Sequence, residues 1–239
     1  MQVKLVCGFV LVALLLGMGM AMAAEIPDDW YALKFTDING SVMVSSSFGK
    51  LSGKSQFTVE FWTKPIQPLG DGVAIFDYEQ YLVQQRKDNT YRIRYHLDGA
   101  WRTNHYLDVS DVIDDWHHIA FSWDGTETRI YLNGELVISS TEDSQYEAVT
   151  QRNRFFVIGG RQGVDDFHGY LTEVRVWLTV RTPEEIKQMM STRLTGKEEG
   201  LIGYWDFSEG SGPFLHDKSG NGNDGIISNA EWVKVADTK

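Results

Sequence analysis

The chain has 239 residues and a formal net charge of −11, from 33 acidic and 22 basic side chains. A chain this acidic repels phosphate backbones, which disfavours nucleic acid as a partner. Its length and its 13% aromatic content allow one sizeable hydrophobic core.

The first 23 residues have the pattern of a secretory signal peptide. Lys4 supplies the positive end, an apolar run follows, and Ala21-Met22-Ala23 matches the small-x-small pattern of a cleavage site. The alternative is an uncleaved anchor, because the apolar run approaches the roughly 20 residues that span a bilayer. Cleavage after Ala23 predicts a secreted or extracytoplasmic protein, periplasmic or at the cell surface, without a membrane segment. Cys7, the single cysteine, would leave with the signal.

Residues 24–239 are predicted to form one domain built mainly of strands. Three stretches alternate apolar and polar side chains as half-buried strands do, namely residues 56–64, 116–123 and 171–178. In the last stretch, simple alternation places Leu171 on the face of Glu173 and Arg175, opposite Val174. Asn133-Gly134 predicts a tight hairpin turn, because both residue types tolerate a positive φ. Asp98-Gly99 and Asp124-Gly125 predict two further turns between strands.

A single helix is predicted, late in the chain. Thr182 is its expected N-cap, Pro183 its first residue, and Glu185 completes a capping box. Many short strands separated by turns, with one short helix in the C-terminal half, predict an all-β, two-sheet antiparallel sandwich.

Five segments resemble, in order, the laminin-G-like jelly roll of the concanavalin A-like lectin/glucanase superfamily: residues 31–44, 57–65, 114–137, 169–186 and 200–225. The resemblance implies a jelly-roll sandwich that is usually secreted and usually serves binding or adhesion. The chain departs from the family at Thr172, where an Asp is usual, and at residues 36–40, which replace an Asp-Gly pair.

The sequence does not predict an enzyme. Retaining glucanases of this superfamily carry Glu-x-Asp-x-(x)-Glu on one strand, but no Glu in this chain has an Asp two residues later. No Gly-x-Ser-x-Gly elbow is present either. His117 and His118 are adjacent on a strand and point to opposite faces, so they cannot bind one zinc ion together. A divergent glycoside hydrolase stays open as an alternative.

The stretch HDKSGNGNDG (216–225) predicts either a calcium site or a set of tight turns. It matches the first half of an EF-hand loop but has Ser228 where that loop needs a bidentate Glu. Jelly rolls of the resembled family often place the loop after the first strand beside the last strands. That arrangement implies a structural Ca²⁺ held by Asp37, Asn39, Asp217 and Asn223. In the alternative, Asn and Asp form Asx turns and Gly supplies positive φ.

Carbohydrate recognition needs exposed aromatic platforms beside hydrogen-bonding side chains. Five of the eight Trp lie in predicted strands and are expected in the core, namely those at positions 62, 116, 123, 177 and 205. Trp101, just after the Asp98-Gly99 turn, is the candidate platform. Its candidate neighbours are Tyr78, Tyr81, His105 and Tyr106, with packing in the core as the alternative for each.

A non-catalytic binding protein whose partner is an extracellular glycan is therefore the favoured hypothesis. A protein–protein adhesion or structural module without affinity for sugars is the first alternative. Such a module would use an exposed apolar patch on a protein surface.

Overall fold

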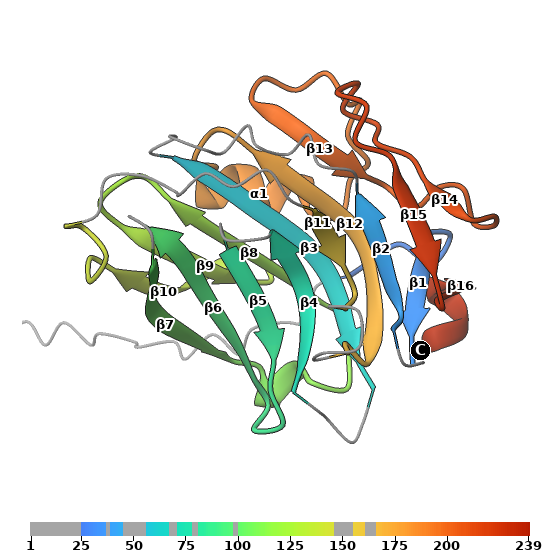
Figure 1. Ribbon diagram of the computed structural model, residues 1–239, viewed down its shortest axis with the longest axis horizontal. Helices are drawn as coiled ribbons and strands as arrows, with labels where there is room; N and C mark the ends of the chain where they lie inside the picture. The colour runs from blue at the N-terminus through green and yellow to red at the C-terminus, as the bar shows by residue number, and fades with distance from the viewer. Residues whose placement is uncertain are drawn as a thin grey trace, which may run out of the picture.

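The computed structural model describes residues 25–36, 39–44, 56–66, 71–77, 81–97, 100–145, 155–160 and 166–239 (Figure 1). The predicted signal peptide, residues 1–23, lies outside this part. Among the described residues, no helix has the length and apolar character needed to cross a membrane.

Two antiparallel sheets, each of eight strands in the described part, pack face to face as a sandwich. Sheet A has the order β10 (Glu135–Ser140), β9 (Thr128–Leu132), β8 (His117–Trp123), β3 (Phe57–Pro65), β12 (Gly169–Trp177), β1 (Tyr31–Phe35), β16 (Glu231–Lys234), with β13 (Leu201–Trp205) also paired to β12. Sheet B has the order β14 (Phe214–Leu215), β15 (Gly225–Ser228), β2 (Ser41–Val44), β11 (Phe156–Ile158), β4 (Gly72–Asp77), β5 (Tyr81–Gln85), β6 (Thr90–Leu97), β7 (Ala100–Asp108). The described residues also form three short helices, namely η2 (Ser110–Val112), α1 (Pro183–Met189) and η3 (Val235–Thr238). The predicted two-sheet antiparallel sandwich is confirmed.

The main core lies between the two sheets and is rich in aromatic side chains. Phe57 of β3 stacks on Tyr81 of β5, with ring centroids 5.8 Å apart and an interplanar angle of 22°. Phe156 of β11 stacks on Trp205 of β13 at 5.1 Å and 15°. These pairs join the sheets across the sandwich, because each sheet contributes one ring to each pair.

A second apolar layer covers the outer face of sheet A. Ile186 of α1 packs against Ala120 and Tyr131 of the sheet. The indole Nε1–H of Trp62 donates to the carbonyl of Met190, at 2.6 Å, just after the helix. All five Trp expected in the core are buried, but Trp62, Trp116 and Trp177 lie in this outer layer rather than between the sheets.

The predicted helix cap and the predicted turn at Asn133-Gly134 are confirmed. The Thr182 hydroxyl accepts the backbone N–H of Glu185, and the Glu185 carboxylate accepts the backbone N–H of Thr182. Asn133 and Gly134 join β9 to β10 with φ of 52° and 78°, in the left-handed region that their residue types tolerate. β6 and β7 pair as a hairpin around Asp98-Gly99, which itself lies outside the described residues.

The side chains of β12 do not follow simple alternation between the two faces of the sheet. Leu171 lies in the main core together with Val174, although alternation puts them on opposite faces. The reason is a bulge in β12 at Glu173, where φ is 52° and the pairing with β3 shifts between Thr172 and Arg175. The bulge inserts one extra residue and so reverses the phase of the strand.

Candidate functional site

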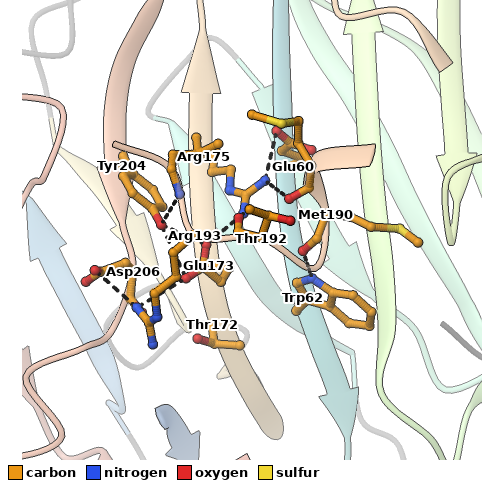
Figure 2. Close-up of polar contacts among 12 residues, drawn as sticks. Glu60, Trp62, Thr172, Glu173, Arg175, Met190, Thr192, Arg193, Tyr204 and Asp206 are labelled. Carbon is orange, nitrogen blue, oxygen red and sulfur yellow. Dashed lines mark hydrogen bonds and ion pairs between the residues drawn. The ribbon is translucent and has the colours of Figure 1, made fainter. Parts of the chain in front are cut away.

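A buried cluster of charged side chains lies between sheet A and the segment after α1 (Figure 2). Glu60 of β3 and Glu173 and Arg175 of β12 are only 1%, 0% and 0% exposed. Arg175 Nη2 donates to Glu173 Oε2 at 2.8 Å, and Arg175 Nη1 lies 3.7 Å from Glu60 Oε1. The same two nitrogens donate to the carbonyls of Met189 (3.0 Å) and Thr192 (2.7 Å). One guanidinium therefore joins two strands to the segment that covers them.

Neighbouring side chains make further contacts with both carboxylates. Glu60 Oε1 accepts the indole N–H of Trp177 at 2.9 Å, and Glu60 Oε2 lies 3.3 Å from His118 Nε2. Glu173 accepts the hydroxyl of Tyr204 at 3.1 Å and lies 3.4 Å from Arg193 Nη1. Each buried carboxylate thus has a charged partner and at least one hydrogen-bond donor, as low-polarity surroundings require.

The two carboxyl groups have pKa values displaced in opposite directions. Burial raises the pKa of Glu173 to about 7, against the opposing pull of Arg175 and Arg193. Burial would also raise the pKa of Glu60, but the hydrogen bond from His118 and the charge of Arg175 outweigh it and lower that pKa to about 2.

Such a divergence is also found in catalytic acid–base pairs, so hydrolysis has to be considered. A glycosidase places both carboxyl groups beside the scissile bond of its substrate. Here Arg175 lies between Glu60 and Glu173, and both groups are sealed beneath the chain that follows α1. The arrangement is suited to fastening the outer layer to sheet A and gives a sugar no access.

The HDKSGNGNDG stretch is closed by its own hydrogen bonds. Asp217 Oδ1 accepts the backbone N–H of Tyr204 at 3.1 Å and of Ser219 at 2.9 Å. Asp217 Oδ2 accepts the backbone N–H and the side-chain amide of Asn223, at 3.0 and 2.8 Å. The Asn223 amide also donates to the carbonyl of Ile202 at 2.9 Å. The loop is thereby tied to β13, and its Asp and Asn side chains behave as turn-forming groups.

These contacts bear on the predicted calcium ligands. An ionised carboxylate has about four acceptor positions, and Asp217 uses them on four N–H groups. Asn39 is described, with φ of 68°, but Asp37 lies outside the described residues. Among the residues that are described, no three His, Cys, Asp or Glu side chains form a group able to hold a metal. As placed, Asp217 uses its acceptor positions on N–H groups of the loop and of β13, and calcium stays a prediction.

The outer face of sheet B presents a different kind of site. We call it the Trp101 face and define it by Trp101, Arg94, Arg92, Gln84, His96 and Tyr106. Partly exposed Trp101 packs against an apolar base formed by Val73, Leu82 and Val157. The guanidinium carbon of Arg94 lies 4.7 Å from the ring centroid of Trp101, and the His96 ring meets it edge-on at 5.3 Å and 85°. The indole is therefore held in place on three sides while part of it stays exposed.

Polar groups extend the Trp101 face along a row of the sheet. Gln84, Arg92 and Tyr106 are paired in register across β5, β6 and β7. Arg92 Nη2 donates to Gln84 Oε1. Tyr106 is 49% exposed, and the Arg86 guanidinium lies 5.9 Å from its ring centroid. Among the described residues, no carboxylate pairs with Arg92 or Arg94.

Four of the five predicted ligand-binding residues are described, and they divide between the surface and the core. Trp101 and Tyr106 both lie on the outer face of sheet B. Tyr81 is fully buried against Phe57, and His105 lies in the core with its Nε2 3.2 Å from Asp143 Oδ2. Tyr78 lies outside the described residues.

Four polar members of the Trp101 face were missed by the sequence reasoning, namely Gln84, Arg92, Arg94 and His96. The signal was present in TYRIRYHL (90–97), where the arginines alternate with Tyr91, Ile93 and Tyr95. Because alternate residues share a face, burying the apolar set places Arg92 and Arg94 outside.

Comparison with known proteins finds relatives that match parts of this chain. Over 179 residues, 68% of its length, the chain is 27% identical to the sushi, von Willebrand factor type A, EGF and pentraxin domain-containing protein 1 of Rattus norvegicus. Over 80 residues, 33% of its length, it is 31% identical to pappalysin-1 of Mus musculus. The aligned part is 5% of each of these proteins, so the chain corresponds to a small portion of either.

Solved structures share the fold. A candidate carbohydrate-binding protein from Bacteroides ovatus superimposes with a TM-score of 0.70 at 20% identity, covering 87% of this chain and 60% of that one. A heptameric pentraxin from Limulus polyphemus superimposes with a TM-score of 0.58 at 14% identity, covering 87% and 96%. The family model described as the concanavalin A-like lectin/glucanases superfamily, of the laminin-G type, matches residues 37–187. With two jelly-roll sheets and a match over more than half of its length, the chain belongs to the concanavalin A-like lectin/glucanases superfamily.

Proposed function

We propose that this protein is a non-catalytic carbohydrate-binding module that acts outside the cytoplasm and binds its ligand on the Trp101 face. The observation that carries the proposal is the indole of Trp101, fixed by Arg94, His96 and an apolar base. A rigid, partly exposed aromatic ring can pack on the apolar face of a sugar at a low cost in entropy.

Polar side chains beside the ring supply the hydrogen bonds that a sugar requires. Gln84 and Arg92 lie in one row of the sheet with Tyr106, so donors and acceptors are presented together with aromatic surface. The structural similarity to a candidate carbohydrate-binding protein supports this function. The signal-like residues 1–23 support a secreted or extracytoplasmic location.

A panel of neutral and acidic oligosaccharides tests the proposal by isothermal titration calorimetry on residues 24–239. We expect at least one glycan to bind, and the Trp101→Ala variant to lose roughly tenfold or more in affinity, as truncation of a central aromatic contact does. Phe214→Ala is the matched control, because Phe214 is also an exposed aromatic of sheet B but lies on the far edge strand β14. Failure of every glycan to bind would contradict the proposal, as would unchanged affinity in Trp101→Ala.

Adhesion through a protein partner is the second candidate function, and one observation favours it. Phe214 and Ile226 are 50% and 57% exposed on the adjacent strands β14 and β15. Exposed apolar side chains that adjoin one another are typical of contact surfaces between proteins. In this case Phe214→Ala, and not Trp101→Ala, would abolish binding to the partner.

The predicted calcium ion is a separate proposal that thermal melts test directly. Binding of Ca²⁺ to the folded state alone would raise the melting temperature by mass action. A rise with Ca²⁺ that EDTA reverses, and that Asp37→Ala removes, supports a structural ion. Identical melts in EDTA and Ca²⁺ would contradict it.

A further inference from the structure

The Trp101 face carries positive charge that the described chain does not neutralise. Arg92 and Arg94 occupy alternate positions of β6 and so share the outer face of sheet B. Among the described residues these two arginines contact neutral groups, namely the Gln84 amide oxygen for Arg92 and the Trp101 ring for Arg94. A chain with a net charge of −11 has abundant carboxylates, but among the described residues none is placed against this pair.

Other arginines of the protein are neutralised by carboxylates. Arg129 on sheet A pairs with Asp124 at 2.9 Å and also with Glu127. Arg175 pairs with Glu173 at 2.8 Å, and Arg193 with Asp206 at 3.1 Å. The neutral surroundings of Arg92 and Arg94 therefore distinguish this pair from them.

The two guanidinium groups are fixed and incompletely satisfied. The Nε atoms of both Arg92 and Arg94 are buried without a hydrogen-bond partner among the described residues. Burial and the charge of Arg92 both lower the pKa of Arg94, so the pair is held together against its own repulsion. An anion placed between such groups gains charge-assisted hydrogen bonds and relieves that repulsion.

We propose that the ligand of the Trp101 face is an oligosaccharide with a carboxylate group, a uronic acid sugar, whose carboxylate is bound by Arg92 and Arg94 while its ring packs on Trp101. This inference rests on the proposed function, since it names the class of glycan for the same site. An arginine fork matches the geometry of a carboxylate with two parallel hydrogen bonds. Uronic acid sugars combine that group with an apolar ring face.

The net charge of the protein argues for a sparsely charged ligand. At −11, the protein repels dense polyanions at long range, and that repulsion grows with the number of charges on the ligand. One carboxylate can pair with Arg92 and Arg94 while contributing little to the repulsion. Short uronate oligosaccharides are therefore expected to bind more tightly than heavily sulfated ones of equal length.

The experiment compares each acidic sugar with its own neutral form. Trisaccharides of galacturonate, glucuronate and mannuronate are titrated by calorimetry into residues 24–239, together with their methyl esters and with a sulfated trisaccharide. We expect at least one uronate to bind tenfold or more tightly than its ester. We expect Arg92→Gln and Arg94→Gln each to reduce that preference at least threefold.

Control variants separate charge from folding. Lys197→Gln removes one positive charge from an exposed site elsewhere and should leave the preference unchanged. Arg92→Gln does not remove the contact between Arg94 and Trp101, so the variant should still bind the methyl ester and should lose less affinity for the ester than for the free acid.

The outcomes distinguish this inference from the proposed function. Equal affinity for acid and ester, or a preference for the sulfated sugar, would overturn the uronate assignment and leave carbohydrate binding intact. The absence of binding to any glycan would overturn both.

Discussion

Replacing Arg175 with Met would remove the charge that joins sheet A to its outer layer while keeping a long apolar side chain. Arg175 is fully buried and contacts Glu173, Glu60 and two backbone carbonyls. The variant removes the cation shared by two buried carboxylates, leaving Glu173 with Arg193 alone and Glu60 with no arginine partner. Breaking a buried ion pair in this way costs about 3–5 kcal/mol. In a domain of this size, each kcal/mol lowers the melting temperature by about 2–4 °C, so we expect a fall of roughly 6–20 °C.

Urea unfolding followed by tryptophan fluorescence measures this loss, and Arg129→Met is the matched control. Arg129 also pairs with two carboxylates, but its side chain is 27% exposed, so removing it should cost only about 0–1 kcal/mol. Adding Glu60→Gln and Glu173→Gln to Arg175→Met should restore part of the stability, because the uncompensated charges disappear. A loss in Arg175→Met no greater than in Arg129→Met would refute the assigned role of the cluster.

Three further predictions concern pH, the closed loop and the helix cap. Because the pKa of Glu60 is lowered to about 2, its contribution to stability is present above pH 4.5 and is lost as the pH falls towards 2. Because the pKa of Glu173 is raised to about 7, the folded state holds an extra proton between pH 4.5 and 7, so this group makes stability rise as the pH falls through that range. In urea unfolding at several pH values, Glu60→Gln should remove the pH dependence of the unfolding free energy below pH 4.5, and Glu173→Gln should remove the pH dependence between pH 4.5 and 7. An unchanged pH dependence in either variant would contradict the assignment. Asp217→Ala should cost at least about 2 kcal/mol in the same assay, because partly buried donors lose their acceptor, whereas exposed His216→Ala should cost little; equal losses would argue against the closed loop. Thr182→Ala should cost about 0.5–2 kcal/mol by loss of the capping box, and wild-type stability would contradict that role.

Features that depend on a few adjacent residues could be predicted from the sequence. The capping box of Thr182 and Glu185 and the turn at Asn133-Gly134 are local, so tertiary contacts had little to alter. The position of Leu171 was not predictable in this way. It depends on the bulge at Glu173, a residue type that gives no local signal for positive φ.

Only part of the candidate site could be predicted, because the sequence does not show which face of each strand is buried in the core. Tyr106 and Trp101 lie outside, while Tyr81 and His105 lie inside, and aromatic character alone does not separate the two sets. The closed state of Asp217 depends on the backbone of Tyr204 in another strand, which no local pattern reveals. The exposed position of Arg92 and Arg94 could have been predicted from the alternation of residues along their strand.

Binding of a glycan on the Trp101 face can be tested by mapping which residues of the protein the bound glycan contacts. Nuclear magnetic resonance of residues 24–239 during titration with a bound oligosaccharide would follow the indole N–H of Trp101 and the Nε–H groups of Arg92 and Arg94. If the ligand binds on the Trp101 face, these signals shift together, while those of Trp232 and of the amides around Asp217 stay unchanged. Shifts confined to β14, β15 or the 216–225 loop, with Trp101 unaffected, would contradict it.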